Sequence, residues 1–258
     1  MKIAVIGYGA IGNFLVSQLV QEPTIDICAI LSQPAPASCP YFLAASIGEL
    51  LQSKPDLVVE CAGHHALHEF GQAVLLSGTD LLVVSVGALA EAALEDSLRS
   101  AAAKGGGRLL IAGGALGGID TISTAREAGL SSVEYVGRKA PAAWKGTAAE
   151  TLIKLDQITE AFTFIQSDAR TIALKFPQNA NVVAALALAG LGFEKTEVKL
   201  VVDPAALGNS HSYVARGSFG EITATIMSRT LESNPKTSML APYSLVQVIK
   251  KRAGLILA

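Results

Sequence analysis

The glycines near the N-terminus are the residues whose spacing predicts a chemistry most directly. Gly7, Gly9 and Gly12 form a GxGxxG motif between the apolar run 3–6 and the start of a helical pattern. In such a motif the first glycine permits a tight turn, the second lets a pyrophosphate approach the backbone, and the third allows close helix–strand packing. The helix N-terminus adds free N–H groups and the positive end of its dipole. A glycine-rich turn without a ligand is the alternative; we expect a dinucleotide to be bound by Gly7, Gly9, Ala10, Ile11 and Gly12.

The end of the second predicted strand lacks the acidic residue that commonly binds the adenosine ribose. That residue is expected about 20 positions after the glycine motif, yet the strand 25–31 is followed by Ser32 and Gln33. Asp26 lies at the start of the strand, and no arginine follows it that could attract a 2′-phosphate. The sequence therefore predicts that either NAD or NADP is accepted.

His211 is the histidine that the pattern favours for proton transfer. It lies in the polar stretch 208–212 between two predicted strands, and loops carry functional residues more often than strands do. Histidine also changes its protonation state near neutral pH. We expect His211 in a loop, acting as a general acid or base; a loop histidine without a catalytic role is the alternative.

The other three histidines, His64, His65 and His68, follow a predicted strand and could suggest a metal site. No carboxylate or thiolate has a spacing that would complete a zinc site, so we expect no metal. Strand ends of a doubly wound sheet face the cofactor crevice. We therefore expect Gly63 and His64 to contact the cofactor through their backbone, and His65 and His68 to be ordinary helix residues.

A basic cluster surrounds the single tryptophan, Trp144. Arg138, Lys139 and Lys145 are its members. Cationic side chains of this kind are the partners that a carboxylate substrate would need. A solvated basic loop is the alternative.

Strands and helices alternate over the first part of the chain and predict the frame that holds the glycine motif. The expected strands are 3–6, 25–31, 57–60, 81–86 and 108–111, and the expected helices are 11–19, 66–77 and 90–103. Apolar strands alternating with helices form a parallel sheet covered on both faces. The predicted class is α/β, with an N-terminal Rossmann-type doubly wound parallel sheet.

After Gly113 the pattern changes to longer, partly alternating strands, which predicts a second α+β domain with an open mixed sheet. The expected strands are 133–136, 161–164, 197–202, 213–215 and 219–227, and the expected helices are 119–128, 178–190 and 241–253. We divide the chain into segments 1–114, 115–235 and 236–258.

Composition excludes several classes of protein. Of the 258 residues, 50% are hydrophobic and 16% are charged, which is incompatible with a disordered chain. A net charge of -2 argues against a nucleic-acid binder or a polybasic membrane anchor, and no run is long enough to span a bilayer. Three cysteines without a CxxC pair favour the reducing cytoplasm.

Six segments together resemble the L-aspartate dehydrogenase family. They are 7–12, 85–89, 114–120, 138–146, 179–182 and 234–238. The Trp-Lys-Gly sequence at 144–146 and the Asn-Pro-Lys-Thr-Ser sequence at 234–238 are much more specific than the glycine motif. The resemblance covers nearly the whole chain.

This resemblance implies roles for particular residues. Ala115 and Asn181 match cofactor-binding positions, and His211 matches the active-site histidine. Lys145, Asn181 and Asn209 are the substrate-binding candidates. The family pattern also implies that segment 115–235 carries catalysis and a homodimer interface on its sheet, and that segment 236–258 packs back near the cofactor domain.

The implied activity is the NAD(P)-dependent oxidation of L-aspartate to iminoaspartate, which hydrolyses to oxaloacetate and ammonia, in NAD biosynthesis or aspartate metabolism. The enzymatic alternatives are an imine reductase similar to dihydrodipicolinate reductase and a homoserine-type dehydrogenase. A dinucleotide sensor without catalytic activity is the alternative from another class.

Overall fold

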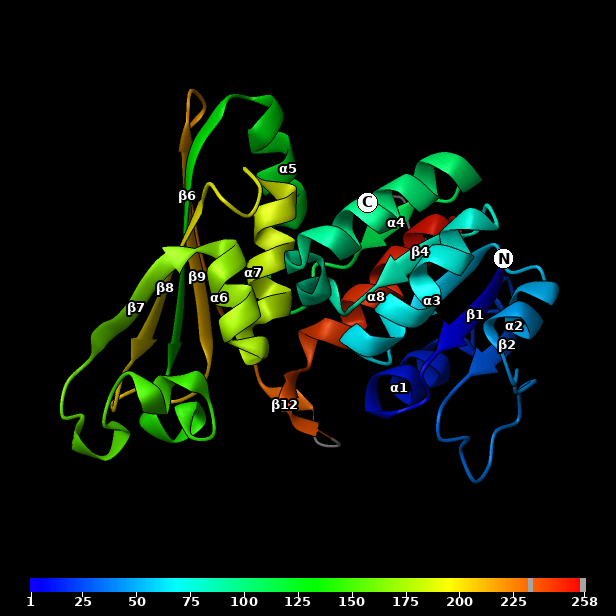
Figure 1. Ribbon diagram of the computed structural model, residues 1–258, viewed down its shortest axis with the longest axis horizontal. Coiled ribbons are helices and arrows are strands. Elements are labelled where there is room, and N and C mark those ends of the chain that lie inside the picture. The colour runs from blue at the N-terminus through cyan, green and yellow to red at the C-terminus, as the bar shows by residue number, and fades with distance from the viewer. Residues whose placement is uncertain (232–233, 256–258) are drawn as a thin grey trace. The chain divides into compact units, whose positions relative to one another are not determined.

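The computed structural model describes residues 1–231 and 234–255, and gives only the backbone of 234–236 (Figure 1). The predicted C-terminal segment therefore extends, at 256–258, outside the described residues. The chain divides into two compact units, Met1–Gly114 with Ala241–Ala258 and Ala115–Leu240. No described helix is both long enough and apolar enough to cross a membrane.

The first unit is built on a five-stranded parallel sheet with the order β2-β1-β3-β4-β5. Its strands are β1 (Lys2–Ile6), β2 (Asp26–Leu31), β3 (Leu57–Glu60), β4 (Asp80–Val83) and β5 (Leu109–Ile111). Because β2 and β3 lie on opposite sides of β1, the strand order reverses there, and ligands bind at such switch points beyond the carboxyl ends of the strands. The predicted Rossmann-type sheet is confirmed.

Five α-helices and one 3-10 helix accompany this sheet. They are α1 (Ala10–Leu19), α2 (Ile47–Gln52), α3 (His64–Leu76), η1 (Val86–Ala90), α4 (Ala92–Gly105) and α8 (Leu240–Arg252). The sequence pattern does not predict α2, which is too short to show a clear apolar periodicity. Its start is nevertheless capped, since Ser46 Oγ accepts the Glu49 N–H at 3.2 Å.

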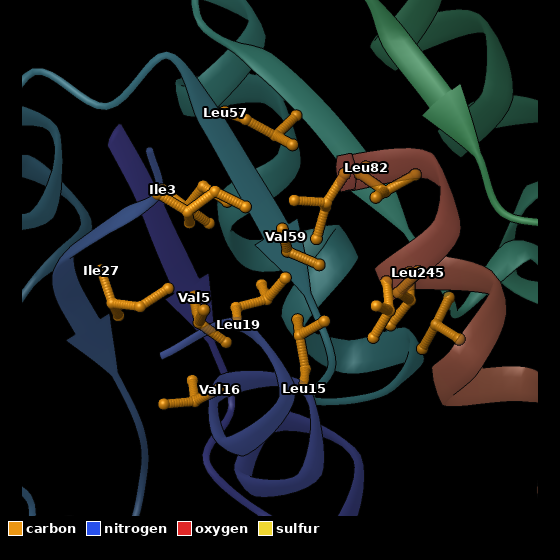
Figure 2. Close-up of a cluster of buried hydrophobic side chains, with 14 of the residues drawn as sticks. Ile3, Val5, Leu15, Val16, Leu19, Ile27, Leu57, Val59, Leu82 and Leu245 are labelled. Carbon is orange, nitrogen blue, oxygen red and sulfur yellow. The ribbon is translucent and has the colours of Figure 1, made fainter. Parts of the chain in front are cut away.

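One apolar core joins this sheet to helices α1 and α8. Figure 2 shows Leu245 of α8 gathered with Leu15 of α1 and with Val59 and Leu82 of the sheet. The last helix of the chain therefore belongs to the core of the first unit, although the whole second unit precedes it in sequence.

The second unit is built on a five-stranded mixed sheet with the order β10-β9-β6-β8-β7. Its strands are β6 (Leu130–Lys139), β7 (Phe162–Asp168), β8 (Thr196–Val202), β9 (Ser210–Gly217) and β10 (Gly220–Met227). Strands β6 and β8 are parallel, and the other neighbours are antiparallel. A separate pair is formed by β11 (Thr230–Leu231) and β12 (Asn234–Ser238). The predicted mixed sheet is confirmed.

Three helices of this unit lie on one face of its sheet (Figure 1). They are α5 (Ile119–Glu127), α6 (Ala169–Lys175) and α7 (Pro177–Ala189), and three 3-10 turns, η2 (Pro141–Trp144), η3 (Ala148–Thr151) and η4 (Leu155–Gln157), follow β6. Helix α6 was not predicted; Asp168 caps it by accepting the Thr171 N–H at 2.9 Å.

The structure corrects the expected position of His211. This residue lies within strand β9 and is 7% exposed, rather than in a loop. Its neighbours Ser210 and Ser212 are only partly buried, so His211 points to the covered face of the sheet while the two serines alternate with it. The polar stretch therefore resembled a loop because polar residues flank the one position that faces inward.

Candidate active site

The glycine motif in the first unit has the geometry that its spacing predicts. Gly7 has a φ of +95°, and a Cβ there would lie 2.8 Å from Ala62. A Cβ on Gly12 would lie 2.0 Å from the carbonyl oxygen of Gly7, so α1 can begin there only with glycine. A Cβ on Gly9 would meet no atom within 4 Å. The backbone at Gly9 is thus the open point at which a large group can approach.

A cavity of about 480 Å³ lies beside this motif. It is lined mainly by the glycine loop, by the end of β2 with the loop after it, and by the start of α3; the lining residues include Gly7, Tyr8, Gly9, Ser32, Gln33, Pro34, Ala62, His65, Glu69 and Phe70. Helix α1 has no side-chain cap and no acidic residue in its first turn, so its N–H groups are available to an anion. The open backbone at Gly9, the available N–H groups at the start of α1 and the adjoining cavity together fit a dinucleotide.

Glu60 supports the other wall of this cavity, a role that no motif in the sequence predicts. Its carboxylate is 1% exposed and accepts the backbone N–H groups of Ala62 and Gly63, each at 2.7 Å. The N–H and hydroxyl of Ser85 also donate to it, at 3.1 and 3.0 Å. Burial raises the pKa of Glu60, and these donors oppose that shift. A carboxylate directly after the apolar run 57–59 was the available signal.

The second unit holds His211 in a buried polar cluster. The hydroxyl of Tyr135 lies 2.6 Å from His211 Nδ1, and the two rings stack with their centroids 6.0 Å apart. Across the strands His211 pairs with Gly137 of β6, so Tyr135, Gly137 and Lys139 present alternate positions of β6 to the same covered face.

Lys139 and Asn179 complete the cluster. Lys139 is 4% exposed; its Nζ donates to Asn179 Oδ1 at 2.8 Å and lies 4.8 Å from the centroid of the Trp144 ring. Asn179 comes from α7, and its Nδ2 donates to the Tyr135 hydroxyl at 3.5 Å. No carboxylate of the described residues pairs with Lys139.

Burial dominates the acid–base properties of this cluster. It lowers the pKa of Lys139 to about 8 and, together with the nearby charge of Lys139, lowers the pKa of His211 to about 4. Burial also raises the pKa of the Tyr135 hydroxyl, with a smaller opposing effect of Asn179. At neutral pH the cluster therefore contains a neutral imidazole, a neutral phenol and one ammonium.

Gly137 makes room for this arrangement. A Cβ at this position would lie 2.9 Å from Asn179 Nδ2 and 3.1 Å from the Tyr135 hydroxyl. Any larger residue would separate the side chains that link Lys139 to His211.

The predicted substrate residues differ from this buried cluster in being exposed. Lys145 is exposed and pairs with Asp156, their Nζ and Oδ1 atoms being 3.0 Å apart. Asn181 is exposed on α7, and Asn209 is exposed in the loop before β9. Their substrate contacts remain predictions, as does the cofactor contact of Ala115, which is buried at the start of the second unit.

From the sequence, Lys139 is only a member of the basic cluster, and neither Tyr135 nor Asn179 stands out. The signal was the alternation of Tyr135, Gly137 and Lys139 along one strand, which becomes informative once β9 is known to lie beside β6. Among the described residues, no three His, Cys, Asp or Glu side chains gather into a group that could hold a metal ion.

Known proteins resemble this chain along its whole length. The L-aspartate dehydrogenase of Cupriavidus necator is 40% identical over 260 residues, which cover 98% of each protein. That of Pseudomonas aeruginosa is 39% identical and covers 99% of each. The family described as "Aspartate dehydrogenase, C-terminal" matches residues 120–252. The chain belongs to the aspartate dehydrogenase family. The resemblance predicted from the motifs is thereby confirmed.

Solved structures agree with this membership of the aspartate dehydrogenase family at the level of the fold. Aspartate dehydrogenase from Thermotoga maritima superimposes with a TM-score of 0.81 at 22% identity, covering 100% of this chain and 99% of that one. An archaeal homoserine dehydrogenase in complex with NADPH gives a TM-score of 0.58 at 13% identity, covering 100% and 98%. Residues 7–112 match the family "Homoserine dehydrogenase, NAD binding domain". The first unit is thus an NAD-binding domain.

Proposed function

We propose that this protein oxidises L-aspartate with NAD or NADP to iminoaspartate, which hydrolyses to oxaloacetate and ammonia. The activity named for its relatives supports the proposal. The observation that carries it in this chain is the buried ammonium of Lys139, which lies in one cluster with His211 and has no described carboxylate partner.

A buried ammonium requires an anion or strong hydrogen bonds to compensate its desolvation. Lys139 has one acceptor, Asn179 Oδ1, and the face of the Trp144 ring. A carboxylate of aspartate would supply the missing negative charge. Lys145 and Asn209 remain candidates for the second carboxylate.

When bound, NAD or NADP would supply the hydride acceptor for the oxidation at the substrate Cα. The residues that would hold its pyrophosphate are Gly9 and the first N–H groups of α1, at Ala10 and Ile11. Gly63, which Glu60 holds at the start of α3, would contact the cofactor through its backbone.

His211 is the residue that we propose exchanges protons or hydrogen bonds with the reacting groups. Its ring is neutral at the pH of the cell because burial and Lys139 lower its pKa to about 4. A neutral imidazole in a water-poor cluster can bind a substrate oxygen or nitrogen without carrying a competing charge.

The proposed assembly is a homodimer that covers the open face of the second sheet. On that face β6, β9 and β10 present Val136, Ser212, Val214 and Thr225, which are only partly buried or exposed. None of the helices α5, α6 and α7 lies there (Figure 1).

The free thiols Cys28, Cys39 and Cys61 fit the reducing cytoplasm as the place of action.

The test is an assay of the purified protein with NAD and NADP against amino acids, including L-aspartate and L-homoserine. We expect reduction of the cofactor with L-aspartate. Lys139→Met should raise the KM for aspartate at least tenfold, because loss of a charged hydrogen bond costs about 1.5–3 kcal/mol. Lys175→Met, an exposed lysine of α6, is the matched control and should leave KM unchanged.

Turnover of homoserine but not aspartate would instead support the homoserine-type alternative. Binding of the cofactor without turnover of any amino acid would support a sensor. Either result would refute the proposed function.

A further inference from the structure

We propose that Lys139, Asn179 and Tyr135 form a hydrogen-bond chain that fixes His211 as its Nε2–H tautomer, so that the resting site offers the substrate a proton donor. This inference rests on the proposed function only where it assigns His211 to the substrate. The hydrogen-bond chain itself is argued from the contacts of the four side chains. Lys139, Asn179 and Tyr135 are positioning residues, since they act through His211.

The first link orients the amide of Asn179. An ammonium has three N–H donors and no acceptor, so the atom of Asn179 that lies 2.8 Å from Lys139 Nζ must be the oxygen. The nitrogen of the amide then faces Tyr135. This orientation follows from the chemistry of lysine.

The second link directs the hydrogen of Tyr135. Asn179 Nδ2 carries only donors and lies 3.5 Å from the Tyr135 hydroxyl oxygen, so it can donate to that oxygen but cannot accept from it. The phenol has a single hydrogen. Its other close partner is His211 Nδ1 at 2.6 Å, and the hydrogen therefore points to that nitrogen.

The third link sets the imidazole. A ring nitrogen that accepts a hydrogen bond carries no hydrogen, and a neutral imidazole then carries its hydrogen on the other nitrogen. His211 Nδ1 is the acceptor, so the hydrogen resides on Nε2. Burial supports the neutral state, because it lowers the pKa of His211.

This tautomer makes His211 a hydrogen-bond donor to the substrate at the start of the reaction. An Nε2–H group can donate to an oxygen or nitrogen of the substrate, and a neutral imidazole serves as such a donor in other enzymes. The same nitrogen cannot accept a proton while it holds this hydrogen. The amine of aspartate must therefore lose its proton to a group other than His211 Nε2 before the hydride leaves Cα.

The isosteric substitution Asn179→Asp should invert the tautomer. A carboxylate beside Lys139 is ionised and accepts from both Lys139 and the Tyr135 hydroxyl. The Tyr135 hydrogen then points to residue 179, and the phenol oxygen becomes the acceptor for His211 Nδ1–H. A purely structural role of Asn179 would not move the hydrogen of His211 from one nitrogen to the other.

The measurement is long-range ¹H–¹⁵N correlation NMR of protein labelled at histidine, at pH 7.5. The chain has 4 histidines, and the His211 signals are assigned from their loss in His211→Asn. We expect unprotonated Nδ1 and protonated Nε2 in the native protein, and protonated Nδ1 in Asn179→Asp. Protonated Nδ1 in the native protein, or unprotonated Nδ1 in the variant, would overturn the proposal.

Two further variants keep the test decisive if Asn179→Asp does not fold. Tyr135→Phe removes the donor to Nδ1 and should give a mixture of His211 tautomers. A single unchanged Nε2–H form would contradict the proposed hydrogen-bond chain. Tyr213→Phe is the matched control: this buried hydroxyl lies on the same sheet but donates to the Gly117 carbonyl, so the tautomer should not change.

The spectra need no turnover and separate this inference from the proposed function. A protein that oxidises aspartate but has protonated Nδ1 would refute the tautomer alone. A protein with the expected tautomer but no activity on aspartate would refute the function alone.

Discussion

At the scale of single residues, the environment of His211 disfavours its charged form. Burial first, and the charge of Lys139 second, lower its pKa from the ordinary 6.5 to about 4. In the unfolded chain the imidazole returns to water and regains its ordinary pKa. Between pH 6.5 and 4 the unfolded state therefore binds a proton that the folded state does not, and the free energy of unfolding falls as the pH is lowered through this window.

This linkage predicts that His211→Asn reduces the acid sensitivity of the protein. One pKa unit corresponds to about 1.4 kcal/mol, so lowering the pH from 7.5 to 5 should cost the native protein roughly 2 kcal/mol through this residue alone. Urea unfolding of both proteins at the two pH values measures the effect. His65→Asn, an exposed histidine of α3, is the control and should retain the native sensitivity. Equal losses of stability in the native protein and His211→Asn would contradict the assignment.

At the scale of elements, two glycines of one motif have separate roles. Gly12 is required for the fold, since its Cβ would meet the Gly7 carbonyl oxygen at 2.0 Å, where β1 turns into α1. Gly9 is the N-cap of α1, has a φ of -78° that any residue tolerates, and has open space where a Cβ would be. Packing therefore does not require a glycine at this position, and we propose that the approach of a ligand does.

We predict that substitution of Gly9 affects cofactor binding, whereas substitution of Gly12 affects the stability of the fold. Gly9→Val should leave the melting temperature nearly unchanged and abolish the binding of both NAD and NADP, as measured by calorimetry. Gly12→Ala should lower the melting temperature, because the displaced carbonyl also disturbs the contact of α1 with the sheet. A Gly9→Val protein that binds the cofactor with native affinity would refute the assignment of the pyrophosphate to this loop.

The element β6 shows how one strand can position a whole cluster. Its alternate residues Tyr135 and Lys139 reach the covered face, while Gly137 between them leaves the space that Asn179 fills. On the opposite face, Arg138 pairs with Asp203 at 2.8 Å. The alternation of the strand thus places the buried Lys139 and the half-buried Arg138 on opposite faces of the sheet.

At the scale of the whole molecule, the last helix of the chain, α8, completes the apolar core of the first unit. Leu245 of α8 is 0% exposed in the core that α1 and the sheet form (Figure 2). Arg252, in the last turn of the same helix, pairs with Asp80 of β4. The first unit therefore lacks part of its core until residues after the second unit have been added.

Loss of this packing should be costly. Leu245→Ala removes a buried side chain and should lower the free energy of unfolding by about 2–5 kcal/mol. Leu240→Ala, at the exposed start of the same helix, is the control and should change it by less than about 0.5 kcal/mol. Thermal and urea unfolding measure both. Equal effects of the two substitutions would contradict the role given to α8 in this core.

Features that depend on neighbours along the chain can be predicted from the sequence alone. The GxGxxG spacing, the alternation of apolar strands with helices, and the change of pattern after Gly113 all predict the two sheets correctly. These signals are strong because the strand and helix periods and the needs of a tight turn act over a few consecutive residues. The short helices α2 and α6 are not predicted from the sequence, because a helix of two turns or fewer shows little apolar periodicity.

Which side chains share a site depends on the tertiary structure. Tyr135 and His211 are 76 positions apart, and Lys139 and Asn179 are 40 apart. Their contact depends on the pairing of β9 with β6 and on the placement of α7 over that sheet, which no local pattern encodes. Burial depends on the same packing, and so does the shift of the His211 pKa. For this reason the sequence could nominate His211 and a basic cluster, but only the folded chain distinguished the buried Lys139 from the exposed Lys145.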